Sequence, residues 1–371
     1  MITPRYFPHM GGIETHVHEV GRRLVRQGVG ITLLTTEPLE LYHQFPRESE
    51  DEGMRVIRVK AWPPGRDYYI APEIFSLVKQ ATWDLIHCQG CHTFVPPVGM
   101  LAAKRANIPY IVTFHTGGHS SAFRNNIRAV QWQLLRPLLT RASMLIGVSR
   151  FEADYFRRAL RLPSRQFRVI PNGSTLPALA HPAPSSNTSS RALIVSVGRL
   201  EKYKGHQRLI AALPKIREYS PYARLLILGA GPYEANLRQL AQQTGVAHAV
   251  DIRSVPANDR QGVAEVLSQA TLVALLSEYE AHPVAVMEAL ALRRPVLVAD
   301  TSGLREIARQ GLARAIPLHS TPEEVARAAM QQIEEPLIPP AYLALPTWDD
   351  CARQLLDIYS GILAGREQCA S

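Results

Sequence analysis

Short hydrophobic runs alternate with segments of helical periodicity along most of the chain. Such runs, with little polar alternation, are typical of strands that are buried on both faces of a sheet. Because the predicted strands are separated by helical patterns, we expect parallel sheets with crossover helices, which is an α/β fold. The predicted strands lie at 30–35, 54–59, 85–88, 110–114, 144–148 and 167–170, and a second series begins with 192–197 and 224–228.

Several helices are predicted from their ends or from one apolar face. Gly11 and Gly12 precede a helical stripe made of Ile13, Val17, Val20 and Leu24. Further on, Thr321 supplies an N-cap, Pro322 a first helical residue and Glu324 the acid of a capping box. The last predicted helix is amphipathic, with an apolar face of Trp348, Ala352, Leu355, Ile358, Tyr359 and Ile362.

The strand that should open the first sheet is short. The chain starts with Met1-Ile2-Thr3-Pro4, so few apolar residues come before the first proline. We therefore expect a shortened first strand. If residues are missing there, a central strand is lost, and the unburied apolar surface should cost several kcal/mol of stability.

The domain organisation follows from a change in composition. Residues 176–191 are rich in Pro, Ser and Ala and have no periodicity, as expected of a linker. We predict a first domain at 1–175, a second at 192–345, and a C-terminal helix and tail at 346–371. A chain of 371 residues suits two domains that each bury a core.

Composition and charge indicate the class of protein, its location and its partners. The hydrophobic content of 46% and the charged content of 20% are those of a globular protein, and no long apolar run or signal peptide is evident, so we expect a cytoplasmic protein. The net charge of +9 favours anionic surfaces, which makes the inner face of a membrane a candidate for peripheral contact. Nucleic acid is not an expected partner, because no nucleic-acid-binding motif accompanies the charge.

The cysteines raise an alternative. Cys88-Gln89-Gly90-Cys91-His92 has the spacing of a c-type haem attachment site, and the two cysteines could also serve as a redox pair or zinc ligands. Haem attachment needs an oxidising compartment, which the missing signal peptide opposes. We interpret the spacing as coincidence. A haem protein would show a Soret band on purification.

Two carboxylates stand eight positions apart across a loop-to-helix transition. Glu280 precedes the predicted helix and Glu288 lies within it. If the helix starts near Pro283, with proline in its first turn, its positive end lies between the two acids and can hold a phosphate. Acids that bind hydroxyls on either side of a phosphate site suit a nucleotide sugar.

Two cations follow the strand at 192–197. Arg199 and Lys204 lie in a turn at the carboxyl edge of the predicted sheet. A guanidinium fork and an ammonium can neutralise a diphosphate without a metal. His16 and His18 point to different faces of their predicted helix and make a poor metal pair, so we predict no metal site.

The chain resembles the retaining glycosyltransferases of family 4, also called glycosyl transferases group 1, over nearly its whole length. The landmarks, in the family's order, are Pro8-His9-Met10-Gly11-Gly12-Ile13-Glu14-Thr15-His16-Val17, Thr113-Phe114-His115-Thr116, Gly147-Val148-Ser149, Ile170-Pro171-Asn172-Gly173, Gly198-Arg199, Lys204-Gly205, Glu280 with Glu288, and Gly303-Leu304-Arg305-Glu306. The resemblance implies a GT-B fold, in which two Rossmann-like domains face each other across a cleft and the C-terminal helix crosses back to the first domain.

The resemblance also implies roles for single residues. Arg199 and Lys204 match the family's diphosphate-binding pair, Glu280 the acid near the donor sugar, and Glu288 the acid that binds the ribose. His115 matches a histidine near the transferred sugar, and Gly11 and Gly12 match the loop that approaches the phosphates. His16 is a weaker candidate for lining the cleft. The expected catalytic residues are thus His115, Arg199, Lys204 and Glu280.

The expected activity is transfer of a hexose-type sugar, without metal or other cofactor, from a UDP- or GDP-linked donor to a hydroxyl. The acceptor class stays open between carbohydrate, lipid-linked and small-molecule acceptors, including polysaccharide precursors. The acceptor-side loops are 42–52 and 117–126. A nucleotide-sugar 2-epimerase of related fold and a noncatalytic binding scaffold are the alternatives.

Two departures from the family pattern affect the donor side. Ala281-His282-Pro283 replaces a common Gly-Phe-Gly, so the donor's identity does not carry over. Arg293 replaces the usual glycine after the helix that holds Glu288, at a cost of about 1 kcal/mol if that residue stays left-handed.

Overall fold

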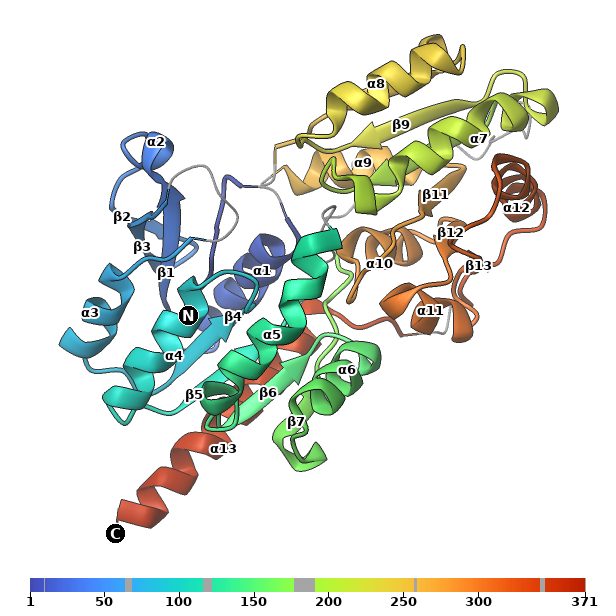
Figure 1. Cartoon of the computed structure of the whole chain (residues 1–371). Helices are drawn as coiled ribbons and strands as arrows, with labels where there is room; N and C mark the ends of the chain where they lie inside the picture. The colour runs from blue at the N-terminus through green and yellow to red at the C-terminus, as the bar shows by residue number, and fades with distance from the viewer. Residues whose placement is uncertain are drawn as a thin grey trace. The chain divides into compact units, whose positions relative to one another are not determined.

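The computed structural model describes residues 1–9, 11–63, 69–115, 122–176, 191–256, 259–340 and 344–370 (Figure 1). These residues form two compact units. Unit 1 comprises the described residues of 1–115, 123–173 and 346–370, and unit 2 those of 174–345. Residues 177–190 of the predicted linker and 117–121 of the predicted acceptor loop lie outside the described residues, and residues 122–126 of that loop belong to a helix instead.

Unit 1 contains two sheets that the chain's first residues connect. One sheet has the order β1-β3-β2 and the other β4-β5-β6-β7. Ile2 forms parallel bridges to Leu34 in β1 and to Cys88 in β4, so a shortened first strand lies between the sheets. All other pairings are parallel except that of β2 with β3. The strands are β1 (Thr32–Pro38), β2 (Glu48–Asp51), β3 (Met54–Ala61), β4 (Ile86–Gln89), β5 (Tyr110–Thr113), β6 (Met144–Gly147) and β7 (Phe167–Val169).

The helices of unit 1 bury their apolar faces on these sheets. In α1, Val17, Val20 and Leu24 are fully buried, as the helical stripe predicted, while Ile13 is half-buried. The helices are α1 (Gly12–Arg26), α2 (Leu39–Tyr42), α3 (Glu73–Gln80), α4 (Val95–Arg105), α5 (Ala122–Leu139) and α6 (Arg150–Leu160), with a 3₁₀ turn η1 (Ser164–Gln166).

The C-terminal helix α13 (Trp348–Ala370) belongs to unit 1, although it follows unit 2 in the sequence. Trp348 is fully buried beside Gly173, where the backbone leaves no room for a Cβ. Asp349 accepts a hydrogen bond from Nε of Arg23 in α1 at 2.9 Å, and the Tyr359 hydroxyl lies 2.6 Å from Nδ1 of His87 in β4. The predicted return of the last helix to the first domain is confirmed.

Unit 2 is a single parallel sheet with the order β10-β9-β8-β11-β12-β13. Successive strand residues serve opposite faces, so that Ile194 and Val195 belong to different core clusters. Helices therefore cover both faces, as in a Rossmann-like fold. The strands are β8 (Leu193–Val197), β9 (Arg224–Leu228), β10 (Val250–Arg253), β11 (Leu272–Leu275), β12 (Val296–Ala299) and β13 (Arg314–Ile316). The helices are α7 (His206–Tyr219), α8 (Glu234–Gln243), α9 (Arg260–Gln269), α10 (Val284–Ala291), α11 (Ser302–Arg309) and α12 (Pro322–Glu334), with 3₁₀ turns η3 (Lys202–Lys204) and η4 (Ala247–Ala249).

Three predicted helix ends can be compared with the structure. The capping box of Thr321 and Glu324 ahead of α12 is confirmed. Pro283 is the N-cap residue of α10 rather than a residue of its first turn, because its ψ of 114° is extended. Arg293 has a φ of 54° and so keeps the left-handed conformation for which glycine is favoured.

Candidate functional site

The candidate donor residues in unit 2 lie at the carboxyl edge of its sheet. Arg199 and Lys204 follow β8, Glu280 follows β11, and Glu288 is in α10 directly after that loop. In open parallel sheets this edge is where ligands bind. The fold therefore gathers residues that are far apart in the sequence.

Lys204 and Glu280 form a mostly buried ion pair. Nζ of Lys204 donates to Oε1 of Glu280 at 2.6 Å, and the two side chains are 15% and 10% exposed. Burial alone would lower the pKa of Lys204, but the Glu280 carboxylate outweighs it, and the pKa is raised. Lys204 is therefore an ammonium at any physiological pH, and Glu280 accepts from only one of the three N–H donors of that ammonium.

The backbone of Glu280 is held from both sides. Its N–H donates to Oγ of Ser302 at 2.8 Å, and its carbonyl accepts from the N–H of Gly303 at 2.8 Å. Ser302 has a φ of 42°, an uncommon conformation for a residue with a side chain. The start of α11 thus fixes the loop that carries Glu280.

Replacing Gly303 by alanine should destabilise unit 2. A Cβ at this position would overlap the carbonyl oxygen of Ala281, and the backbone next to Glu280 would have to move. We expect a loss of about 1–3 kcal/mol in the free energy of unfolding, measured by urea denaturation. The control is Gly361→Ala in α13, where a Cβ meets nothing. Equal stability of the two variants would contradict this.

Arg199 is held by the turn that follows β8. Its Nη2 donates to the Tyr203 hydroxyl at 3.2 Å, and its carbonyl oxygen lies 3.4 Å from Nε2 of His206. Gly205 has a φ of 78°, and a Cβ there would overlap the carbonyl of Leu276, so only glycine fits the turn. The turn is thereby packed against the end of β11, on the side of the sheet where Glu280 begins its loop.

Glu288 has a partner that the sequence analysis did not find. Its side chain is 2% exposed, and its Oε1 accepts from Nη2 of Arg260, the first residue of α9. The strand before α9, β10, was not predicted, so no sequence signal placed Arg260 at the carboxyl edge.

The amino end of α10 lies between the two acids in the sequence. Its N-cap Pro283 provides no side-chain cap. The preceding His282 is buried, and burial lowers its pKa to about 4, so its imidazole is neutral. Between Glu280 and Glu288, therefore, no charged side chain lies at this end of the helix, and the helix dipole supplies the local positive potential.

The candidate residues of unit 1 form a separate group. His115 follows β5 with a φ of 48°, is 8% exposed, and its Nε2 lies 2.8 Å from Oε1 of Gln89. The centroid of its ring lies 4.4 Å from that of the His16 ring. Nδ1 of His16 in turn lies 2.9 Å from Oδ1 of Asn172. Burial lowers the pKa of both histidines, to about 4 for His16. Both imidazoles are neutral at physiological pH.

Gly11 and Gly12 lie where the sequence placed them, at the start of α1. Gly11 is the N-cap residue and is fully extended, with a φ of 177°, and it offers no side chain to cap the helix. A Cβ on Gly12 would meet nothing. The structure thus brings Gly11, Gly12 and His115 into unit 1, and Arg199, Lys204, Glu280 and Glu288 into unit 2.

The cysteine motif does not form a reactive site in the structure. Cys88 and Cys91 are fully buried in the hydrophobic core of unit 1. Burial raises the pKa of both thiols, that of Cys88 to about 12, so they are protonated at physiological pH. They pack as small apolar residues. No cluster of three metal-ligating side chains occurs among the described residues.

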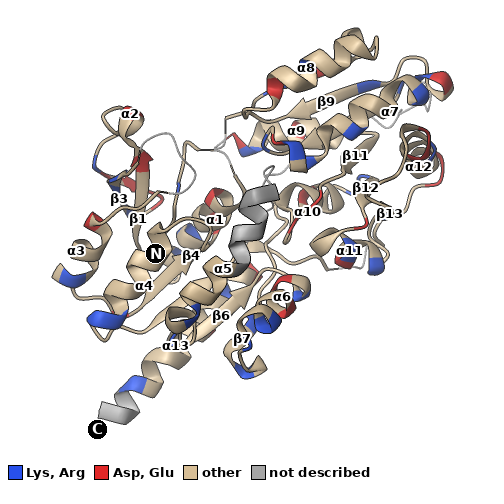
Figure 2. Cartoon of the chain, viewed as in Figure 1, with Lys and Arg blue, Asp and Glu red and all other residues tan. Residues whose placement is uncertain are grey.

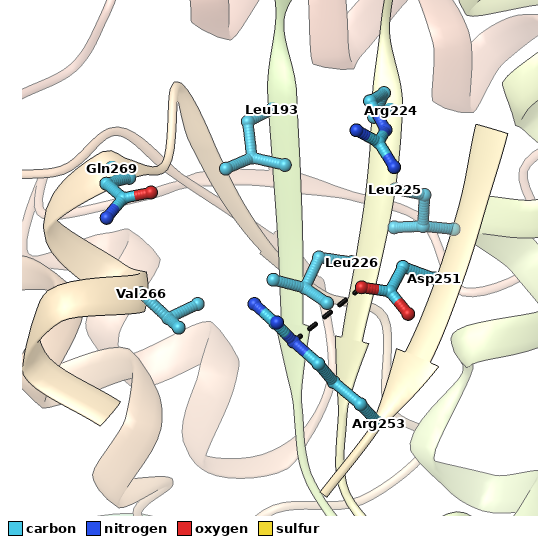
Figure 3. Close-up of a pocket in the computed structure, with 8 residues that line it drawn as sticks. All are labelled: Leu193, Arg224, Leu225, Leu226, Asp251, Arg253, Val266 and Gln269. Carbon is cyan, nitrogen blue, oxygen red and sulfur yellow. Dashed lines mark ion pairs between the residues drawn. The ribbon is translucent and has the colours of Figure 1, made fainter. Parts of the chain in front are cut away.

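A pocket in unit 2 lies apart from the candidate residues (Figure 3). Leu193 and Arg224 are the first residues of β8 and β9, so the pocket lies towards the amino ends of these strands. Its charged residues Arg253 and Asp251 are both about half exposed and face each other, with Nε and Oδ2 3.6 Å apart. The pocket is lined by Leu193, Arg224, Leu225, Leu226, Asp251, Arg253, Val266 and Gln269 and contains none of the predicted donor residues.

Two family models together match most of the chain. Glycosyltransferase Family 4 matches residues 10–175, and Glycosyl transferases group 1 matches residues 180–343. The chain belongs to the family 4 glycosyltransferases. In this family-4 chain the second match contains Arg199, Lys204, Glu280 and Glu288.

Relatives of this glycosyltransferase cover its full length. A D-inositol 3-phosphate glycosyltransferase of Nocardiopsis dassonvillei is 26% identical over 96% of this chain and 91% of its own. The structure of sucrose-phosphate synthase from Thermosynechococcus elongatus superposes with a TM-score of 0.74 at 19% identity, over 100% and 99% of the two chains. HepE of Anabaena, solved in complex with UDP-glucose, gives a TM-score of 0.68 at 19% identity over 99% of each chain. These neighbours share the GT-B fold.

Basic and acidic residues both occur on helices of both units, as the colouring in Figure 2 shows. Among the residues that the structure describes, no helix is long and apolar enough to cross a membrane.

Proposed function

We propose that this chain is a retaining, metal-independent glycosyltransferase that moves a hexose from a nucleoside diphosphate sugar to a hydroxyl acceptor. The observation that carries the proposal is the Lys204–Glu280 pair at the carboxyl edge of the unit 2 sheet, with Arg199 in the same turn. HepE, which binds UDP-glucose, shares the fold and supports a nucleotide-sugar donor.

Departure of the nucleoside diphosphate is the step that these residues would assist. As the bond from the sugar's C1 to the β-phosphate oxygen breaks, negative charge develops on the phosphate and positive charge on the sugar ring. The guanidinium of Arg199 and the two N–H donors of Lys204 not used by Glu280 would stabilise the phosphate. Glu280 would accept hydrogen bonds from the sugar's hydroxyls. The acceptor hydroxyl would attack C1 from the face that the diphosphate leaves and would pass its proton to the departing phosphate.

The residues of unit 1 would serve the acceptor and the transferred sugar. His115, as a neutral imidazole, can exchange hydrogen bonds with sugar hydroxyls without adding charge. Gly11 and Gly12 would let the backbone approach the phosphates. A lipid-linked or polysaccharide-precursor acceptor at the inner face of a membrane agrees with the net charge of +9.

Calorimetry with UDP, GDP and ADP tests the donor site. We expect one of them to bind the purified chain with micromolar affinity and the Arg199→Ala variant to bind it at least about tenfold more weakly, because a charge-assisted hydrogen bond to phosphate is lost. Arg238→Ala, which breaks an exposed ion pair with Glu234 on α8, is the matched control and should bind normally. If the folded wild-type protein binds none of the three, the proposed donor site is wrong.

A further inference from the structure

Arg260 and Glu288 form the second ion pair at the carboxyl edge of unit 2. Arg260 begins α9 after β10, while Glu288 lies one turn from the end of α10, and these two helices are in contact. The Arg260 side chain is 18% exposed and Glu288 is 2% exposed. The N-cap Asp259 fixes the first turn of α9 by accepting from the N–H of Gly262 at 2.8 Å. Arg260 therefore projects from an ordered helix start.

The pair matters because of the burial of Glu288. A carboxylate removed from water is stable in its charged form only beside a cation or several N–H donors. Arg260 binds Oε1, and the structure shows no hydrogen bond to Oε2 from any described residue. The carboxylate thus has one oxygen tied to a fixed cation and a second oxygen for a hydroxyl donor.

We propose that Arg260 is a positioning residue that keeps Glu288 ionised and oriented to accept hydrogen bonds from the 2′- and 3′-hydroxyls of the donor's ribose, so that the site selects ribonucleotides over 2′-deoxyribonucleotides. This inference rests on the proposed function. A neutral Glu288, or one free to turn, accepts these hydrogen bonds less well, because charge-assisted hydrogen bonds are about twice as strong as neutral ones.

The Arg260–Glu288 ion pair resembles the Lys204–Glu280 ion pair in its place in the fold. In each case a cation that follows one strand, in a turn or at the start of a helix, pairs with an acid that follows another strand. Lys204 retains N–H donors for a phosphate, whereas Arg260 acts on the nucleotide only indirectly, by orienting Glu288. A residue that acted directly on phosphate would affect all nucleoside diphosphates alike, with or without the 2′-hydroxyl.

Nucleotide selectivity tests the inference. UDP and 2′-deoxy-UDP, with GDP and 2′-deoxy-GDP as a second pair, are titrated into the wild type, Arg260→Gln, Arg260→Lys and the control Arg238→Gln. We expect the wild type and the control to prefer the ribonucleotide by about tenfold or more, as loss of a hydrogen bond to a charged group implies. Arg260→Gln should lower this preference to about threefold or less, and Arg260→Lys should restore part of it, since a cation again faces Glu288.

A double-mutant comparison of unfolding stability tests whether the Arg260–Glu288 ion pair stabilises the charged form of Glu288. Arg260→Gln leaves a buried carboxylate without its cation and should lower the midpoint of urea unfolding. Adding Glu288→Gln should recover part of that loss.

The outcomes separate the two proposals. If a ribonucleotide binds and Arg260→Gln keeps the wild-type preference, Arg260 does not position Glu288, and the inference is overturned while the proposed function stands. If no nucleoside diphosphate binds the folded wild type, the proposed function fails and this inference fails with it. If the second substitution brings no recovery of stability, the ion pair does not hold Glu288 ionised, which also overturns the inference.

Discussion

The Lys204→Ala variant should lose sugar transfer while still folding. Removing the ammonium takes away the cation that pairs with Glu280 and that, in the proposed mechanism, stabilises the departing phosphate; loss of one such stabilising group costs about 100- to 1,000-fold in kcat. The measurement is the rate of nucleoside diphosphate release from the donor. We also expect a loss of about 3 kcal/mol in stability, because Glu280 is left mostly buried without its counterion.

Two variants make this prediction specific. Lys215→Ala removes an exposed lysine that pairs with Glu218 on α7 and should change neither rate nor stability measurably. The double variant Lys204→Ala with Glu280→Gln should regain part of the stability but none of the rate, since the phosphate still lacks its cation. A Lys204→Ala enzyme with wild-type kcat would show that Lys204 is only a structural partner of Glu280.

Acid should weaken both units well before most carboxylates titrate. Burial lowers the pKa of His16 in unit 1 and of His206 and His282 in unit 2 to about 4 each, and it also holds the pKa values of His87 and His115 well below the usual value of a histidine. In the unfolded chain a histidine titrates near 6.5. Between these values the unfolded state binds more protons, so stability is complete above pH 6.5 and falls as the pH drops towards 4.

The buried histidines alone should account for a large loss of folding stability in acid. Lowering the pKa of one histidine such as His16 from 6.5 to about 4 corresponds to a loss of about 3 kcal/mol of stability as the pH falls from 6.5 to 4. Urea unfolding at pH 7.5, 6, 5 and 4.5 should therefore show a progressive loss of several kcal/mol. Stability that stays constant down to pH 4.5 would disprove the prediction.

Several strands that are apolar runs could be predicted from the sequence, whereas two polar or mixed edge strands could not. β3 and β5 lie inside their sheets and are buried on both faces, which explains their apolar sequences, and the edge strand β7 was predicted as well. β2 (Glu48–Asp51) and β10 (Val250–Arg253) are edge strands, and their polar or mixed residues resemble a loop. Because β10 was not predicted, the start of α9 at the carboxyl edge of the sheet was not predicted either.

The candidate site shows the same limit. Eight landmarks in the family's order, among them Arg199, Lys204 and the pair Glu280 and Glu288, predicted the family, which the family models confirm. The pairing of Lys204 with Glu280 joins residues 76 positions apart, and only the strand order β8-β11 brings them together. Arg260 carries no motif of its own, and its relevance comes entirely from its contact with the buried Glu288.

The central claim is that the chain transfers a sugar. The most direct measurement is chromatography of the products after incubating UDP-glucose, GDP-mannose and ADP-glucose with the wild type and with Lys204→Ala, in the presence of simple hydroxyl acceptors. We expect free nucleoside diphosphate from one donor, together with an equal amount of transferred or hydrolysed sugar, and almost none from the variant. A new nucleotide sugar without free nucleoside diphosphate would instead indicate an epimerase, and a donor that binds but is never turned over would indicate a noncatalytic scaffold; either result would contradict the account.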